Sequence, residues 1–202
     1  ESAETTEVSS LRHFGWLTSE QETRLFYEPP RPFSRDGDLG RLAAALGATR
    51  YMPATRPTIA RDLHHLAGRG VVSSVLCLED AIPDADIAAA EANLVSQMRS
   101  LSTSHAEGSG DLPLIFIRVR ELSQIARVVE RAAECARLIS GFVLPKFDPG
   151  TGRAYLEEVE RLSSATAIRF LSMPVLETAE VLHLETRQAS LLRTRALLDE
   201  YR

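Results

Sequence analysis

SVLCLED, residues 74–80, is a short apolar run that ends in two adjacent carboxylates. An apolar run of this length is typical of a strand buried on both faces of a sheet. Four other runs of the same kind occur at 50–53, 114–119, 141–144 and 168–176. Together with 74–78, the second run along the chain, they predict five strands. Longer amphipathic stretches separate these runs from about residue 38 onward, which is typical of parallel βαβ units. The sequence therefore predicts an α/β fold with about five βα units.

The amphipathic stretches between the strands predict helices. They lie at 39–46, 58–66, 87–101, 122–139, 152–162 and 178–201. In the third of them, apolar residues recur at helical spacing: Ile87, Ala90, Leu94 and Met98. Glu91 and Arg99 fall on other faces of that helix. We therefore expect one stripe of this helix to face the core.

The composition excludes several classes of protein. The 202 residues contain 23 Lys and Arg against 28 Asp and Glu, a formal net charge of −5, which does not indicate a nucleic-acid partner. No apolar run approaches the roughly 18 residues of a membrane span. We therefore expect a soluble protein. Cys77 and Cys135 are too few for a disulfide framework, so we also expect a reducing, cytoplasmic setting. The sequence also lacks a dinucleotide fingerprint between a strand and a helix and a Walker phosphate loop.

Residues 1–37 are expected to form an N-terminal extension or connector, and 38–202 the α/β domain. Residues 28–32, EPPRP, have the P-x-x-P spacing of a polyproline ligand. The alternative is a stiff connector that leads three aromatic residues onto the outside of the main domain: Phe14, Trp16 and Phe26.

Charged residues follow each of the five expected strands at its carboxyl end. They are Arg56, Glu79 and Asp80, Arg118, Lys146, and Glu177. The carboxyl ends of parallel strands meet at one edge, where open α/β sheets and (β/α) barrels alike build their active sites. Carboxylates opposite cations suit a divalent metal with an anionic substrate. Each acid alone could instead cap a helix N-terminus or interact favourably with the helix dipole there. The dipole does not favour a cation at that place, so this alternative does not account for Arg118 or Lys146.

The order of five motifs resembles a known family. They are M-P-A-x-R-P (52–57), L-E-D-A-I (78–82), R-V (118–119), V-L-P-K (143–146) and P-V-L-E-T (174–178). Over roughly residues 50 to 180 the chain resembles the citrate lyase beta-subunit-like, or HpcH/HpaI aldolase, family. The resemblance implies a (β/α)8 TIM barrel of the phosphoenolpyruvate/pyruvate-binding kind. It also implies the use of Mg²⁺, or Mn²⁺, to cleave or form C–C bonds in small acids or their CoA thioesters.

The resemblance further implies a role for each charged residue at the strand ends. Arg118 would bind the substrate carboxylate and the enolate oxygen, and Glu177 would be a metal ligand. Glu79 and Asp80 would act with Arg118 in catalysis and line the metal and its waters. Two further cations would contact the anionic substrate: Arg56 and Lys146. A metal and a guanidinium beside a developing enolate stabilise its charge more in the transition state than in the ground state.

Three departures from the family pattern bear on this expectation. Cys77 stands where the family reads the first Asp of D-L-E-D, and Arg120 where it often reads the Asn of R-V-N. These changes would alter substrate choice or weaken the metal site. The family's second metal-binding aspartate has no counterpart before Arg202, so we expect it beyond that residue. Five βα units account for about 150 residues and eight would need roughly 240, which predicts an incomplete barrel; the alternative is an open five-stranded sheet.

The leading hypothesis is a Mg²⁺-dependent C–C lyase, of the aldolase or citryl-/malyl-CoA lyase type, that works through a metal-stabilised enolate. The alternative is a catalytically impaired relative that binds a small acid or a protein. A third hypothesis is a phosphotransfer or pyruvate-binding enzyme on a similar barrel. The expected partners are a small keto acid or an acyl-CoA, without nucleic acid or membrane, and related barrels suggest a homo-oligomer, either a trimer or a hexamer.

Overall fold

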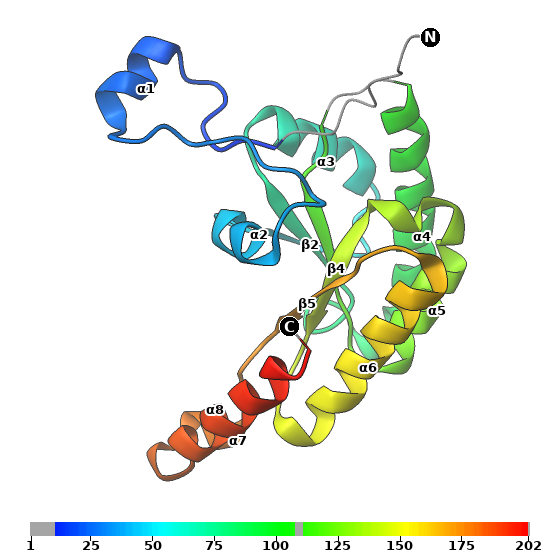
Figure 1. Ribbon diagram of the computed structural model, residues 1–202. Coiled ribbons are helices and arrows are strands. Elements are labelled where there is room, and N and C mark those ends of the chain that lie inside the picture. Colours follow the sequence, from blue (N-terminus) through cyan, green and yellow to red (C-terminus); the bar gives the residue numbers. More distant parts are fainter. Residues whose placement is uncertain (1–10, 108–110, 202) are drawn as a thin grey trace, which may run out of the picture.

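The computed structural model describes residues 11–107 and 111–201, and Figure 1 shows their arrangement. The strands are β1 (Arg50–Pro53), β2 (Ser73–Cys77), β3 (Leu114–Arg118), β4 (Ile139–Leu144) and β5 (Leu171–Pro174). The α-helices are α1 (Ser19–Leu25), α2 (Leu39–Ala45), α3 (Ile59–Gly68), α4 (Ile87–Ala106), α5 (Ser123–Arg131), α6 (Pro149–Thr166), α7 (Ala179–Leu182) and α8 (Leu184–Asp199). Two 3-10 helices, η1 (Asp84–Asp86) and η2 (Ala133–Leu138), precede α4 and β4. The predicted α/β fold is confirmed.

The five strands form one parallel sheet in the order β1-β2-β3-β4-β5. Each strand is therefore the neighbour of the one that follows it in the chain. This is the strand order of a (β/α) barrel, whereas a doubly wound sheet reverses its order at a switch point. All five carboxyl ends consequently lie at one edge of the sheet, with Cys77 at the end of β2 in register with Arg118 at the end of β3.

Side chains of the strands alternate between two hydrophobic clusters, as the strand period of two requires. Leu76 and Ile117 belong to the larger cluster, which they share with helices α3 to α6. Val75 and Phe116 point the other way and pack with Leu42 of α2. Figure 1 shows α4, α5 and α6 on one side of the sheet and α2 on the other. Arg118 is two residues after Phe116, so it shares the face that α2 covers.

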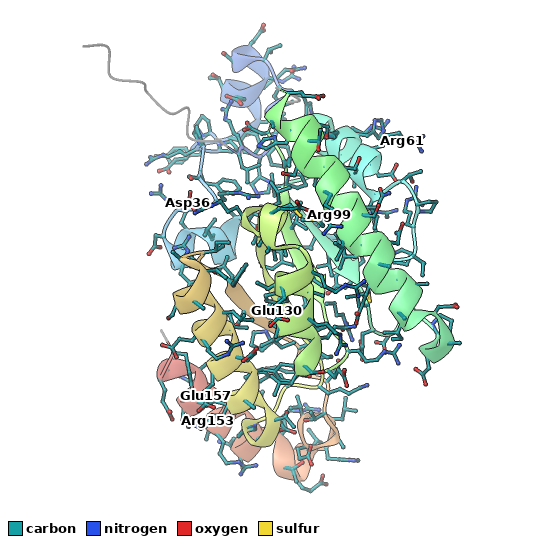
Figure 2. All side chains as sticks on the ribbon, turned by 90° about the vertical axis from the view of Figure 1, so that its right-hand side faces the viewer. Asp36, Arg61, Arg99, Glu130, Arg153 and Glu157 are labelled. Atoms are coloured by element: carbon teal, nitrogen blue, oxygen red, sulfur yellow. The ribbon has the colours of Figure 1, made fainter. Side chains whose placement is uncertain are left out.

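The outward surface of the helical layer is charged. Figure 2 labels exposed residues on α3 to α6: Arg61, Arg99, Glu130, Arg153 and Glu157. These helices thus have one apolar and one solvated face, the amphipathic pattern on which their prediction rested. Among the described residues, no helix combines the length and the apolar composition that crossing a membrane requires.

The two outer strands differ from the expectation that every strand is buried on both faces. β2 and β4 are buried along their whole length, but three of the four residues of β1 are exposed and all four of β5 are only partly buried. The physical reason is position, because β1 and β5 each pair with one strand only within the described sheet. The strand expected at 168–176 is also shorter and spans Leu171–Pro174.

Two predicted helices are interrupted. The helix expected at 122–139 divides into α5 and η2, and its last residue, Ile139, begins β4. Buried apolar residues fit the end of a helix and the start of a strand equally well, so periodicity does not mark this boundary. The helix expected at 178–201 breaks at His183, whose ψ is 130°. The guanidinium of Arg187 donates to two carbonyl oxygens at the end of α7, which compensates for the broken helical pattern.

The N-terminal extension contains a helix, α1, that the sequence analysis did not predict. It begins with a capping box in which Thr18 and Gln21 exchange hydrogen bonds. Before it, Trp16 lies so close over Gly70 that a Cβ there would meet the indole ring at 2.1 Å. Trp16 therefore lies against the main domain, as expected of a connector. Residues 1–10 of the expected extension lie outside the described residues.

We predict that Gly141→Ala disrupts the pairing of β4 with β5. An added Cβ would lie 2.0 Å from the carbonyl oxygen of Leu171, and backbone of a paired strand cannot turn away as a side chain can. The free energy of unfolding, measured by urea denaturation, should fall by about 3 kcal/mol, the upper part of the range for overpacked sites. Gly68→Ala is the matched control, because nothing lies within 4 Å of its Cβ. Equal losses in the two variants would contradict this account.

Candidate active site

Carboxylates from the ends of β2 and β5 meet at Arg118, the last residue of β3. The Nε of Arg118 donates to Glu79 Oε2 at 2.6 Å. Its Nη2 donates to Asp80 Oδ2 at 2.9 Å and to Glu177 Oε1 at 3.2 Å. The structure thus brings together four of the residues that the sequence analysis selected, at the edge where it expected them.

Glu79 is the buried acid of this group, with 3% of its surface exposed. Its Oε1 also accepts a hydrogen bond from Lys146 Nζ at 3.2 Å. Burial by itself raises the pKa of the Glu79 carboxyl, but the hydrogen bonds from Lys146 and Arg118 outweigh burial, so the pKa is lowered. Burial likewise lowers the pKa of Arg118, and its hydrogen bond and charge interaction with Glu79 reverse the sign. Both side chains are therefore ionised at neutral pH.

Lys146 reaches the group from the loop after β4 with an unusual backbone conformation. Its φ is 48°, in the left-handed region that residues with a Cβ rarely adopt. Its backbone N–H donates to Glu177 Oε1 at 3.1 Å while its ammonium contacts Glu79. One residue thereby contacts two carboxylates on different loops. Backbone strain of this kind is concentrated at functional sites.

The three carboxylates around Arg118 do not cap helices. Asp86 occupies the N-cap position of α4, and Thr178 that of α7. The carboxylates of the two strand ends contact Arg118 and Lys146 instead. The alternative reading of these acids as helix caps is therefore not what the structure shows.

Arg56 is the one predicted site residue that the structure does not bring to Arg118. It follows β1, and the ion pair that it makes within the described residues is with Asp62 of α3. Asp62 also accepts a hydrogen bond from Thr58, so its carboxylate is held in place. A contact between Arg56 and a substrate would require it to leave Asp62.

A comparison with protein-family models matches residues 40–202 to a family described as C-C_Bond_Lyase of the TIM-Barrel fold. The chain belongs to this family of C–C bond lyases. The match includes all five strands, and the predicted TIM-barrel fold is confirmed with it. A search of curated proteins finds no match. In TIM-barrel enzymes the active site lies at the carboxyl edge of the strands, which is where the group around Arg118 lies.

In this C–C bond lyase, Arg120 holds the loop that carries Glu79 and Asp80. Its Nη2 donates to the carbonyl oxygens of Glu79 at 2.9 Å and of Ile82 at 2.5 Å, and its Nη1 to Asp84 Oδ1 at 2.5 Å. The cation of Arg120 is thus engaged with the protein's own backbone. Its position in the structure gives it a role in loop geometry.

Gln124 and Glu91, which the sequence analysis did not select, support Arg120 from inside the domain. Gln124 Oε1 accepts from the backbone N–H of Arg120 at 2.7 Å, and Gln124 Nε2 donates to Glu91 Oε1 at 2.7 Å. Arg127 and Arg131 of α5 complete the pairing of the Glu91 carboxylate. A buried chain of hydrogen bonds therefore runs from α4 through α5 to the end of β3.

The expectation that Glu91 lies away from the core-facing stripe is wrong, because Glu91 is only 4% exposed. Its position contains the signal that was missed. Glu91 is four residues after Ile87 and three before Leu94, so it lies at the stripe's own spacing. A charged residue inside an apolar stripe indicates a buried ion pair, and here α5 provides its partners.

Cys77, which stands where the citrate lyase beta-subunit-like pattern has an aspartate, ends the strand that leads to the site. It is a free thiol, 5% exposed, and lies beside Arg118 in the register of β2 and β3. A carboxylate at this position would add a second buried negative charge near the guanidinium. With cysteine at this position, Glu79 is the buried counterion of Arg118.

The group has oxygen ligands of the kind that Mg²⁺ takes. It contains three carboxylates and two cations: Glu79, Asp80, Glu177, Arg118 and Lys146. Asp80 and Glu177 contact the same guanidinium nitrogen, and the hydroxyl of Thr178 is buried without a hydrogen-bond partner among the described residues. No set of three or more His, Cys, Asp and Glu side chains is arranged to hold a metal in the described part of the chain. A divalent cation here would complete its shell with water and substrate.

We predict that Glu79 makes the stability of the protein sensitive to acid. Because the folded state lowers the pKa of this carboxyl below its ordinary value of 4.5, its stabilisation is present above that pH and is lost as pH falls through the folded pKa. Urea denaturation between pH 7 and pH 3 should show a smaller acid loss in Glu79→Gln than in the wild type. Glu157→Gln, on the exposed face of α6, is the control for removing a carboxylate. Identical acid losses in wild type and Glu79→Gln would refute the prediction.

We predict that Arg120→Asn, which restores the residue often seen in the family, loosens the loop from Glu79 to Asp84. The variant loses three charge-assisted hydrogen bonds, so we expect the free energy of unfolding to fall by about 2 kcal/mol. Amide hydrogen exchange should accelerate at Ile82, whose N–H donates to the Glu79 carbonyl. Arg120→Lys keeps the charge without the guanidinium's fork and should show an intermediate effect. Unchanged exchange in Arg120→Asn would show that the loop is held by other contacts.

Proposed function

We propose that the protein is a Mg²⁺-dependent C–C lyase of the citrate lyase beta-subunit-like type, acting on a small keto or hydroxy acid or its CoA thioester. The observation that carries the proposal is the cluster around Arg118, in which carboxylates and a second cation meet at the carboxyl edge of a parallel sheet. The family of C–C bond lyases to which the chain belongs supports the reaction class. The proposal includes a cytoplasmic setting and a homo-oligomer, a trimer or hexamer.

The reaction would break the C–C bond next to a carbinol carbon. The hydroxyl of that carbon loses its proton to a water, its C–O bond becomes a carbonyl, and the electron pair of the broken bond moves onto the carbonyl oxygen of the other fragment as an enolate. The enolate then takes up a proton at carbon from a water. Arg118 would donate hydrogen bonds to this oxygen and to the substrate carboxylate. Lys146 Nζ, which is largely exposed, would contact the same anion. Donors held in advance where charge develops contribute most to such steps.

Glu79 would orient Arg118 in this mechanism. Its lowered pKa makes it a weak proton acceptor at neutral pH, since an effective general base has a pKa near the working pH. Its burial and its two cationic partners instead fix the plane of the guanidinium. Arg120 would preserve this geometry by holding the backbone of Glu79.

Charge balance supports a divalent cation at the same place. Three carboxylates against Arg118 and Lys146 leave one net negative charge, which opposes the approach of an anionic substrate. Asp80 and Glu177 would hold the ion, because they are the more exposed acids and contact the same nitrogen of Arg118. When bound, Mg²⁺ supplies Lewis-acid polarisation of the substrate carbonyl.

A catalytically impaired relative that binds a small acid is the second candidate. Two points favour it: Cys77 lies beside Arg118 where the resembled family pattern has an aspartate, and three carboxylates already contact Arg118 Nη2. A substrate carboxylate must therefore displace Asp80 or Glu177 from the guanidinium. Binding without turnover would distinguish this candidate from the lyase.

We predict that Mg²⁺ and a keto acid together raise the melting temperature of the protein more than either does alone. The measurement is a thermal-shift titration with Mg²⁺ followed by pyruvate, oxaloacetate or acetyl-CoA. Arg118→Gln should abolish the response to the acids, and Glu177→Gln should weaken the response to Mg²⁺. Where an assay of C–C cleavage detects turnover, Arg118→Gln should lower kcat/KM by at least about 100-fold, the typical effect of losing one oxyanion donor.

Arg161→Gln is the matched control for these variants. Arg161 is an exposed arginine on α6 whose ion pair with Glu158 lies on the helix surface, and such pairs contribute about 0–1 kcal/mol. It should respond to metal and acids as the wild type does. A folded wild type that binds acids without turning any of them over would favour the impaired relative. A folded wild type with no response to either ligand would contradict both candidates.

A further inference from the structure

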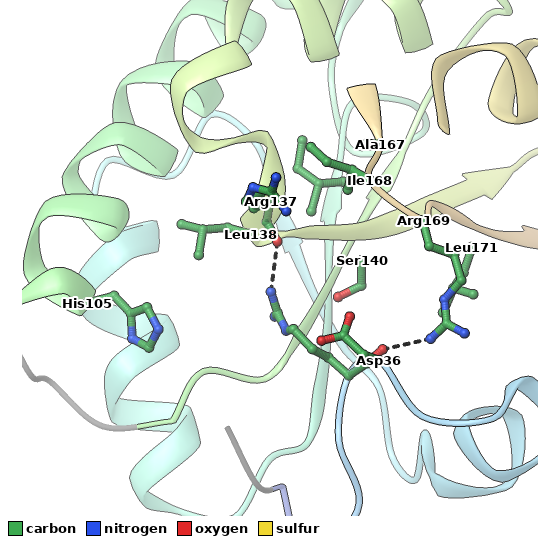
Figure 3. A pocket seen from close by; sticks show the side chains of 11 residues that line it. Asp36, His105, Arg137, Leu138, Ser140, Ala167, Ile168, Arg169 and Leu171 are labelled. Carbon is green, nitrogen blue, oxygen red and sulfur yellow. Dashed lines mark hydrogen bonds between the residues drawn. The ribbon is translucent and has the colours of Figure 1, made fainter. Parts of the chain in front are cut away.

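A cavity lies at the opposite edge of the sheet from Arg118. It has a volume of about 390 Å³, within the range of about 300–1,000 Å³ for small-molecule sites. Its walls come from the segment before α2, the end of α4, the start of β4 and the turn that leads into β5. Ser140 of β4 and Leu171 of β5 lie at the amino ends of their strands, whereas Arg118 lies at a carboxyl end. Figure 3 shows this cavity from close by.

Positive charge gathers around this cavity. Three arginines line it, Arg35, Arg137 and Arg169, and Asp36 is the one carboxylate in its lining. Within the described residues, none of the three arginines forms an ion pair with a carboxylate, in contrast to Arg118. The cavity therefore carries a net positive charge that the described part of the protein does not neutralise.

Arg35 is held in this position by backbone carbonyls. Its Nη1 donates to the carbonyl oxygen of Arg137 at 2.9 Å. Its Nη2 is buried and has no hydrogen-bond partner among the described residues. Arg169 fixes the Arg35 backbone, because its Nη2 donates to the carbonyl oxygens of Arg35 at 3.0 Å and Gly37 at 2.8 Å. The Arg35 guanidinium is thus held in place, with one of its nitrogens left without an acceptor.

The electrostatic state of Arg35 also favours an anion in the cavity. Burial lowers the pKa of its guanidinium, and the charge of Asp36 offsets this only in part. A buried cation without a counterion is unfavourable, and an anion that enters the cavity would remove the penalty. Arginine is the side chain best suited to this role, since its planar fork matches the oxygens of a phosphate or carboxylate.

We propose that this cavity binds a small phosphomonoester, with its phosphate on Arg35, Arg137 and Arg169. The volume holds more than a phosphate group, and besides His105 and Ser140 the remaining walls are apolar: Leu138, Ile139, Ala167, Ile168 and Leu171. The organic part of the ligand packs against these side chains. Figure 3 shows Arg137 and Arg169 on different sides of the cavity, with Asp36 and Ser140 between them.

The test is calorimetric titration of the whole chain at low salt with glycerol 2-phosphate, inorganic phosphate and citrate. Glycerol 2-phosphate should bind more tightly than inorganic phosphate, because it also fills the apolar part. Arg137→Gln and Arg169→Gln should each weaken its binding about tenfold, the effect of losing one charge-assisted hydrogen bond. Tighter binding of citrate through the same arginines would overturn the phosphate class in favour of a polycarboxylate.

Asp36→Asn is the most informative variant, because its predicted effect has the opposite sign. Removing the one carboxylate of the lining should tighten glycerol 2-phosphate binding, which a merely disturbed cavity would not do. Arg193→Gln makes the same charge change as Arg137→Gln and Arg169→Gln, but on α8 and outside the lining, and should bind as the wild type does. Arg118→Gln should also retain this binding, which separates the cavity from the candidate active site.

Three results would overturn the proposal. The first is a folded wild type that binds no glycerol 2-phosphate at low salt. The second is unchanged affinity in both Arg137→Gln and Arg169→Gln. The third is loss of binding in Arg118→Gln, which would assign the phosphate to the opposite edge of the sheet.

Discussion

The partly buried guanidinium of Arg118 requires counterions, and the edge of the sheet is arranged around this requirement. Removing one partner of a fully buried ion pair costs about 3–5 kcal/mol, so a change at Arg118 or at Glu79 alone also affects the other. Their pairing connects the ends of β2 and β3, and Lys146 and Glu177 extend it to the loops after β4 and β5. The parallel register makes this possible, since it aligns the last residues of neighbouring strands.

The features that could be predicted from the sequence are those set by local pattern. The apolar run before Glu79 and the charge at the end of each strand predicted the sheet, its direction and most of the site. Features that depend on tertiary partners were missed. Glu91 is buried only because α5 brings Gln124 and Arg127 to it, and the break at His183 is stable only because Arg187 reaches back to α7. No spacing within one helix contains that information.

The arginines at the two edges of the sheet differ in how their charge is balanced. At the carboxyl edge the charge of Arg118 is balanced by three carboxylates before any ligand arrives, so a ligand must compete for the guanidinium. At the amino edge Arg35 is oriented by a carbonyl oxygen and keeps one nitrogen without an acceptor. The first arrangement favours selectivity, because only an anion that replaces the lost contacts is held. The second favours affinity, because little has to be displaced.

At position 146 the backbone conformation and the side-chain contacts favour different residues. A residue with a Cβ is about 1 kcal/mol less favourable in this conformation than glycine, so the backbone alone would favour glycine here. Glycine would keep the N–H that contacts Glu177 but would remove the ammonium that contacts Glu79. Glycine at position 146 would therefore exchange a backbone cost for the loss of a cation beside a buried carboxylate, so the change in stability on Lys146→Gly measures the balance of the two.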